Sequence, residues 1–269
     1  MGTRMSNKIW KVVLAASIVL IVVASVNIVI LSREYQKGIN EYKELEGYVK
    51  VVEASVEEPT QKEQTAEEAV EEDKESVIPI SVEVDFAALS AINEDLAGWL
   101  YYGPLAINYP VVRGDDNEYY THNTFEHEKN ASGAIFMDSL NKPDMSNYNT
   151  IIYGHNMRNG TMFGSLKKLL NDESIITENP YFYIFTEEKA YMYEIASVYI
   201  TNQTSDTYNL IANEEEQQEY IDYVKSSSTW YWEKELKSSD KIVTLSTCHG
   251  LHSNNRTIVH GVLIAEEDR

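Results

Sequence analysis

The sequence is poor in cysteine, proline and basic residues. It contains one cysteine and six prolines among 269 residues. A single cysteine excludes an intrachain disulfide and any zinc site built from several thiolates. The low proline content excludes a collagen-like or proline-rich chain. The 22 basic residues are outnumbered by 43 acidic ones, which gives a formal charge of −21. Such an acidic surface repels phosphate backbones, so we expect no nucleic-acid partner.

One long apolar run lies near the N-terminus. Residues 9–31 read IWKVVLAASIVLIVVASVNIVIL, with Lys11 as the only charge. A helix needs roughly 20 apolar residues to cross a bilayer. The apolar core of a cleaved signal peptide, the alternative, is usually only about 7–15 residues long. We therefore predict a cytoplasmic tail over 1–8, a transmembrane anchor over 9–31 and an extracytoplasmic location for the rest.

A strongly acidic segment follows the apolar run. Residues 33–50 are compatible with a continued helix, whereas 51–76 are rich in Glu, Gln, Thr and Lys and lack aromatic side chains. Such a composition cannot bury enough apolar surface to offset chain entropy. We predict an acidic extracytoplasmic spacer over 32–79, which would act as a tether.

Residues 80–269 have the composition of a folded domain. Strand-like runs recur between turn signals, and helical patterns are fewer. The pattern predicts a mainly β barrel or sandwich with peripheral helices. The predicted strands are 98–102, 107–113, 133–137, 150–153, 181–186, 190–200, 241–247 and 256–265, and the predicted helices are 85–96, 163–170 and 213–226.

The single thiol is the first candidate for chemistry. The sequence lacks the phosphate-binding pattern G-x-x-x-x-G-K-[ST], the metalloprotease pattern H-E-x-x-H and the nucleophile pattern G-x-S-x-G. Cys248 ends the strand-like run KIVTLSTC, where loops form the rims of sites. A free cysteine is usually a small buried apolar residue. A thiol kept outside the cell is exposed to oxidation, which favours a reactive role.

A catalytic thiol needs a base and a group that stabilises an oxyanion. His155 follows a strand-like run in NTIIYGHNM, and Gly154 would permit a turn that aims the imidazole outward. Arg256 opens the last strand, so its guanidinium could lie beside the thiol. The alternative for Arg256 is a surface arginine at the end of a strand.

Two other histidines follow the thiol closely. His249 is adjacent to Cys248 and would point to the opposite face of the strand. A metal site built from Cys248, His249, His252 and His260 is a further alternative. Its spacing is crowded for one centre, and we predict neither a metal nor a cofactor.

These motifs together resemble the sortases of Gram-positive bacteria. The order is an N-terminal anchor, then YGHNM, then TLSTC, then an arginine that opens a β run. Three longer segments are similar to class B sortases in particular: NTIIYGHNMRNGTMFGSL, NYPVVRGDDNEYY and GAIFMDS. The resemblance extends over residues 86–265. It implies an eight-stranded sortase β-barrel with added helices, preceded by the transmembrane helix.

The resemblance also implies roles for five residues. Cys248 matches the nucleophile, His155 matches the acid/base, and Arg256 matches the residue that stabilises the substrate and the oxyanion. Asn117 and Ser246 match residues beside the substrate groove. At His249 some members have an acidic residue, and the loop from the thiol to the arginine is short for the family, so the rim of the site departs from the pattern.

The implied function is a membrane-anchored cysteine transpeptidase. It would cleave a C-terminal sorting signal of secreted surface proteins after a threonine. It would then join the thioacyl group to a cell-wall peptidoglycan amine. Three alternatives remain open: a cysteine protease that only hydrolyses, a pilin-linking or housekeeping sortase of another class, and a surface adhesin with a buried cysteine.

Overall fold

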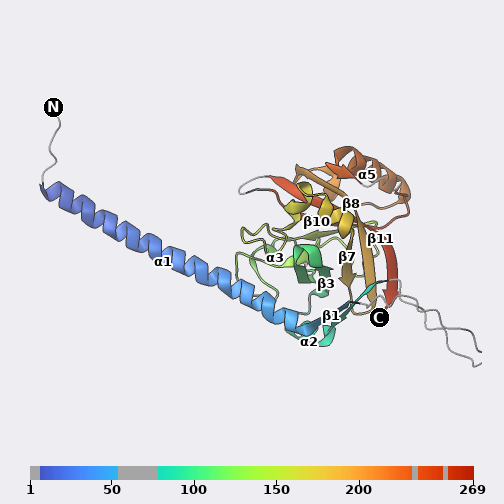
Figure 1. Cartoon of the computed structure of the whole chain (residues 1–269), viewed down its shortest axis with the longest axis horizontal. Coiled ribbons are helices and arrows are strands. Elements are labelled where there is room, and N and C mark those ends of the chain that lie inside the picture. The colour runs from blue at the N-terminus through green and yellow to red at the C-terminus, as the bar shows by residue number, and fades with distance from the viewer. Residues whose placement is uncertain (1–6, 54–77, 232–235, 251–253) are drawn as a thin grey trace, which may run out of the picture.

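A closed barrel of eight strands forms the body of the protein. The computed structural model describes residues 7–53, 78–231, 236–250 and 254–269. Among them, the strand order is β11-β10-β6-β5-β4-β3-β7-β8, and β8 pairs with β11 to close the barrel (Figure 1). The strands are β3 Leu96–Tyr102, β4 Ile107–Val112, β5 Ile135–Met137, β6 Asn149–Tyr153, β7 Tyr181–Phe185, β8 Lys189–Asn202, β10 Ile242–Cys248 and β11 Asn255–Asp268.

The predicted barrel and its strands are confirmed. Each predicted strand overlaps an observed one, and the two long strands β8 and β11 extend beyond the predicted bounds. These two strands pair antiparallel over nearly their full length, with register shifts near His260 and Leu263. Large aromatic side chains such as Trp99, Tyr193 and Phe182 are fully buried in the core. One small strand, β9 (Trp230–Tyr231), extends the sheet beside β8.

A capping residue fixes where the longest of the predicted peripheral helices begins. The side chain of Asn213 accepts hydrogen bonds from the first amides of α5 (Glu214–Ser227). Helix α5 buries Tyr220, Ile221 and Val224 against the barrel, at the spacing of one helical face.

Two predicted helices are shorter than expected. Helix α2 (Phe86–Ile92) stops before Leu96 because Asn93 adopts an extended conformation and its side chain accepts from the amide of Asp95. Over 163–170, the helical part is a 3₁₀ helix at Leu166–Leu170. The short helices α3 (Tyr119–His122) and α4 (Ser174–Glu178) were not predicted.

The predicted spacer does not separate the N-terminal helix from the barrel. Helix α1 (Asn7–Leu45) is continuous, and Tyr42 and Leu45 near its end are buried in the barrel's main core cluster. Strand β1 (Val49–Glu53) then pairs antiparallel with β2 (Ile80–Val84). Glu53 pairs with Ile80, so the described strands on either side of 54–77 lie side by side. Residues 54–77 themselves are outside the described part. The helix over 33–45 agrees with the expected continuation, but its docking was not predicted, because a few apolar side chains on one helical face suffice to dock a polar segment.

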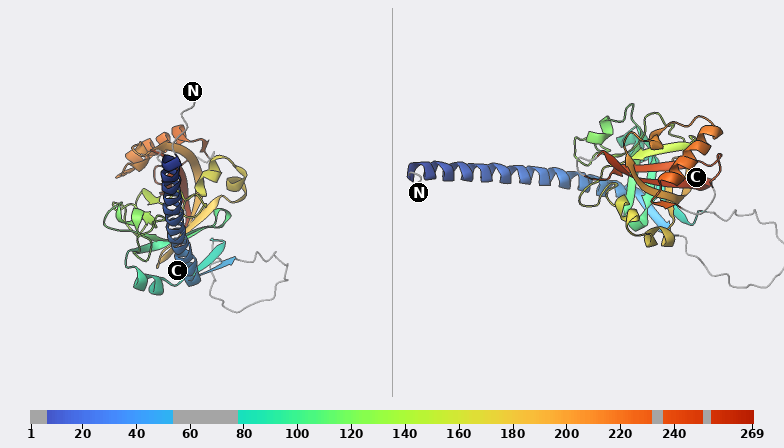
Figure 2. Two further views of the ribbon diagram at one scale, coloured as in Figure 1. Left: turned by 90° about the vertical axis from the view of Figure 1, so that its left-hand side faces the viewer. Right: turned by 90° about the horizontal axis from the view of Figure 1, so that it is seen from above.

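The first part of α1 is exposed and apolar. The helix is long and apolar enough to cross a membrane, and none of its most apolar 18-residue stretch is buried in the protein. The right-hand view of Figure 2 shows the helix leaving the barrel as a straight rod. Of the predicted cytoplasmic tail, residues 1–6 lie outside the described part.

Candidate active site

A pocket of about 440 Å³ opens where β6, β10 and β11 meet. All five residues that the sequence singled out line it. The complete lining comprises Asn117, Thr121, Phe136, Tyr153, Gly154, His155, Gln203, Thr204, Tyr208, Ser246, Thr247, Cys248 and Arg256.

The register of two parallel strands brings the thiol and the imidazole to the same edge. Strands β6 and β10 run parallel, and Tyr153 pairs with Ser246. His155 and Cys248 each follow two residues later. Side chains two residues apart in a strand share a face. Cys248 therefore shares the face of Ser246, and His155 follows the end of β6 at the same edge of the sheet. Both side chains line the pocket.

The antiparallel pair β10–β11 places Arg256 directly across from Cys248. Cys248 and Arg256 are direct cross-strand partners, whose side chains lie on the same face. Arg256 Nη2 donates to the side-chain oxygen of Gln203 at 2.7 Å, and Nη1 donates to the Asn255 carbonyl at 3.2 Å. These contacts direct the guanidinium along the pocket wall.

The end of β10 is fixed from its other side as well. Asn156 Nδ2, on the segment that follows β6, donates to the Cys248 carbonyl at 2.7 Å. The thiol itself is free and partly exposed. A partly exposed thiol at a pocket wall is accessible to a ligand, unlike a structural cysteine sealed in a core.

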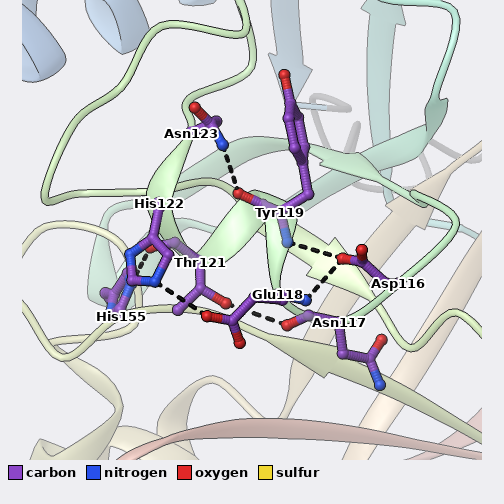
Figure 3. A network of polar contacts seen from close by, with 8 residues as sticks. All are labelled: Asp116, Asn117, Glu118, Tyr119, Thr121, His122, Asn123 and His155. Atoms are coloured by element: carbon purple, nitrogen blue, oxygen red, sulfur yellow. Dashed lines mark hydrogen bonds and ion pairs between the residues drawn. The ribbon is translucent and has the colours of Figure 1, made fainter.

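His155 is held by a backbone carbonyl. Its Nε2 lies 2.7 Å from the carbonyl oxygen of Thr121 in α3 (Figure 3). A carbonyl oxygen only accepts hydrogen bonds, so Nε2 carries a proton and Nδ1 holds the lone pair of the neutral ring. Nδ1 is therefore the nitrogen that can exchange a proton. Close packing rather than a turn favours Gly154 here, because a Cβ would lie 2.8 Å from the ring of Phe163 and would also meet Ile135 Cδ1.

Side-chain hydrogen bonds hold the short helix that carries this carbonyl. Asp116 Oδ1 accepts from the amides of Glu118 and Tyr119 at 2.9 and 2.8 Å (Figure 3). Thr121 Oγ1 donates to the carbonyl of Asn117 at 3.1 Å. The hydrogen bonds from the backbone amides of Tyr119 and Glu118 lower the pKa of Asp116. The carboxylate thus stays charged where the helix begins, a favourable place for an anion.

Ser246 belongs to a polar and aromatic pocket wall. Its hydroxyl lies 2.8 Å from that of Tyr208, whose ring stacks on Tyr153 at 6.2 Å. Burial raises the pKa of Tyr208, opposed by the Ser246 bond and by the positive charge of Arg256. The Tyr208 hydroxyl therefore remains protonated and can donate a hydrogen bond in the pocket.

Asn117 spans the rim of the pocket. Its Nδ2 donates to Asp138 Oδ2 at 2.9 Å, and its Oδ1 accepts from the Ser139 amide at 2.8 Å. Tyr153 also donates to Asp138, at 2.8 Å. Both ends of the amide are thus engaged with the rim that follows β5 rather than with His155.

The other described histidines are engaged elsewhere. His249 Nδ1 lies 3.0 Å from Thr257 Oγ1, so its ring turns away from the Cys248 face. His260 is buried, and burial lowers its pKa to about 3. The described residues contain no group of three or more His, Cys, Asp or Glu side chains that could hold a metal ion. His252, the remaining member of the alternative metal set, lies outside the described residues.

Sequence reasoning missed part of the pocket. Gln203, Thr204 and Tyr208 follow β8, and Thr121 contributes through its backbone. No motif marks the residues after β8, because their place depends on the closure of β8 against β11. A backbone carbonyl has no sequence signal at all.

Comparison with known proteins places most of the barrel in one family. A family model for the sortase domain matches residues 104–264. Sortase B of Listeria monocytogenes is 35% identical over 183 residues, covering 66% of this chain and 73% of that protein. Sortase B of Staphylococcus aureus is 33% identical over 174 residues, covering 64% and 70%.

Solved structures show the same relationship. A sortase B structure from Bacillus anthracis, in complex with AAEK1, has a TM-score of 0.68 at 29% identity, covering 86% of this chain and 98% of that chain. A Staphylococcus aureus sortase B–substrate complex has a TM-score of 0.62 at 31% identity, covering 66% and 84%.

Proposed function

The chain belongs to the sortase family, with class B sortases as its relatives, and on that premise we propose that it is a membrane-anchored cysteine transpeptidase. Its donor substrate is the C-terminal sorting signal of a secreted surface protein. Its acceptor is an amine of the cell-wall peptidoglycan. The single observation that carries the proposal is the strand register, which gathers Cys248, His155 and Arg256 around one pocket.

The first half of the reaction forms a thioester. The Cys248 sulfur, as thiolate, attacks the carbonyl carbon of the threonine in the sorting signal, and the carbonyl oxygen becomes an oxyanion. Arg256 lies directly across from Cys248, where its N–H groups can stabilise that charge. Collapse of the intermediate breaks the peptide bond. Protonated His155 donates a proton from Nδ1 to the leaving amine, and the acyl group stays on the sulfur.

The second half transfers the acyl group. An incoming amine attacks the thioester carbonyl, and His155 Nδ1 accepts the proton that the amine loses. The sulfur leaves as thiolate, and an amide bond is formed. The hydrogen bond from Nε2 to Thr121 keeps the same nitrogen facing the reaction in both halves. Covalent catalysis thereby divides one difficult step into two easier ones.

The test uses the full chain in detergent micelles. The docked end of α1 supplies buried core residues, so a fragment that starts after it would lack part of the fold. We would incubate the protein with a library of x-P-x-T-x peptides and read cleavage by mass spectrometry. Added amine nucleophiles should give amide products. Cleavage after threonine that is lost on Cys248→Ala would support the proposal.

The same experiment separates the alternatives. Cleavage that yields only the free acid with every amine would favour a hydrolase. The absence of both cleavage and a thioacyl species would favour an adhesin with an inert thiol. The motif selected from the library, and the amine used best, would distinguish class B from a pilin-linking or housekeeping enzyme.

The membrane anchor is part of the proposal. Residues 9–31 form the exposed apolar part of α1, and we place the N-terminus in the cytoplasm and the barrel outside. Protease added to intact spheroplasts should then degrade the barrel. A barrel that is protected until the cells are lysed would contradict this orientation.

A further inference from the structure

The end of α1 is fastened to the loop that leads to the pocket. We define the docking segment as residues 34–45 of α1. Asn130 Nδ2 donates to the Glu34 carbonyl at 2.8 Å, and the Glu126 amide donates to Glu41 Oε1 at 3.0 Å. Glu41 is buried, and burial raises the pKa of its carboxyl group. The docking segment thus contacts the 125–133 loop at several places along its length.

Tyr42 makes the deepest of these contacts. Its side chain is buried, and its hydroxyl donates to the carbonyl of Gly133 at 2.6 Å. The same oxygen accepts from the Phe125 amide at 3.3 Å. Its ring packs edge-to-face on Tyr109 with centroids 5.5 Å apart. A single hydroxyl therefore links the helix to both ends of the loop.

Gly133 lies directly against the catalytic imidazole. Its φ of +55° falls in the left-handed region that favours glycine. A Cβ there would meet the Thr121 carbonyl oxygen at 2.9 Å and His155 Cδ2 at 3.0 Å. The ring of His155 and the carbonyl that holds its Nε2 therefore border the space beside Gly133 and leave no room for a side chain there.

We propose that Tyr42 is a positioning residue for His155, acting through Gly133 and the Thr121 carbonyl. The Tyr42 hydroxyl holds the Gly133 carbonyl, and Gly133 packs beside the Thr121 carbonyl and the His155 ring so closely that a Cβ would not fit. Docking of α1 thus sets the angle at which Nδ1 faces the pocket. The inference rests on the proposed acid/base role of His155.

Loss of the Tyr42 hydroxyl should affect the chemical step more than substrate binding. Tyr42→Phe keeps the ring but removes the donor to Gly133. We expect kcat to fall about tenfold, because small displacements of a catalytic group cost this much or more. KM should stay within about twofold, since Tyr42 does not line the pocket. The ¹⁵N resonances of the His155 ring should shift toward a mixture of tautomers.

Tyr35→Phe is the matched control. Tyr35 lies in the same docking segment, and its hydroxyl approaches Met157 Sδ at 3.8 Å rather than Gly133. We expect this variant to leave kcat, KM and the His155 resonances unchanged. Both variants would be measured as full chains in detergent micelles, after circular dichroism shows that they are folded.

Each outcome decides between the proposals. Unchanged kcat and His155 resonances in folded Tyr42→Phe would overturn the positioning role, as would an equal loss in Tyr35→Phe. If Tyr42→Phe does not fold, 4-fluorophenylalanine at position 42 fills the space of the hydroxyl without donating, and the same readings apply. Full activity of His155→Ala would instead overturn the proposed function. The ring resonances do not depend on turnover, so the two failures remain distinguishable.

Discussion

The two sides of the pocket are built by different means. On the strand side, Cys248 and Arg256 are fixed by the backbone ladders of β6, β10 and β11. On the loop side, which we define as residues 115–133, local backbone hydrogen bonds close the turns, and side chains such as Asp116 and Tyr42 add further bonds to the backbone. The strand ladders carry the thiol and the guanidinium themselves, whereas the loop side carries only the Thr121 carbonyl that contacts His155. We therefore expect substitutions on the strand side to abolish reacting groups and those on the loop side to misplace them.

The largest effect should come from the thiol. Cys248→Ala removes the proposed nucleophile and should lower kcat by at least about 10³-fold, as for other covalent nucleophiles. Intact-protein mass spectrometry should show a peptide adduct on the wild type and none on the variant. Cys248→Ser, which keeps the shape of the side chain, serves as the control for packing. An adduct that persists on Cys248→Ala would place the nucleophile elsewhere.

The next largest effect should come from the guanidinium. Arg256→Lys keeps the charge but loses the planar fork and the bond to Gln203. We expect kcat/KM to fall about 100-fold, the usual loss for one oxyanion donor. Arg158→Lys, at an exposed arginine outside the pocket lining, should change the same constant less than twofold. Similar kinetics for both variants would remove Arg256 from the mechanism.

A smaller effect is expected on the loop side. Asp116→Ala removes the acceptor for two amides at the start of α3 and loosens the carbonyl that holds His155. We expect kcat to fall about fivefold with little change in KM, because the group is displaced rather than lost. Asp115→Ala at the neighbouring exposed residue is the control. An Asp116→Ala variant as impaired as Cys248→Ala would refute the distinction between the two sides.

The smallest effect on turnover is expected for substitution of His260. Its protonation should instead produce a measurable loss of stability. Burial lowers its pKa from 6.5 to about 3, and it lies between Tyr199 and Thr244 beneath the strand side. The unfolded chain binds the proton first, so stability is full above pH 6.5 and falls as the pH drops toward 3. At pH 5 the loss should be about 2 kcal/mol.

Chemical unfolding at pH 7.5 and pH 5 would measure this loss. His260→Gln keeps hydrogen-bonding groups but does not titrate in this range, so it should lose less stability between the two pH values. An equal loss in both proteins would show that other groups control the acid sensitivity. Activity at pH 7.5 should be unaffected in a folded variant.

The strand side was largely predictable from the sequence. KIVTLSTC and NTIIY are rich in β-branched residues, which favour strands, and these strands were placed within a residue or two. Their parallel pairing is a long-range contact that local patterns do not encode. The sortase resemblance supplied it indirectly, by associating the histidine with the thiol.

The loop side was not predictable by the same reasoning. Its key contacts involve the Thr121 carbonyl and the Tyr42 hydroxyl, a backbone atom and a side chain 79 residues apart in the chain. Tyr42 lies in a segment whose mean composition is polar, so it was assigned to the spacer. Average composition over a window hides the few apolar residues that dock a helix.

The unbroken course of α1 fixes how far the enzyme can reach. If residues 9–31 cross the bilayer, Tyr42 comes only eleven positions after Leu31 in the same helix, a rise of roughly 16 Å. The barrel would then lie close above the lipid headgroups, because a rigid helix rather than a flexible linker connects it to the membrane. Substrates would therefore have to reach the membrane surface. This favours donors and acceptors that are still attached to the membrane.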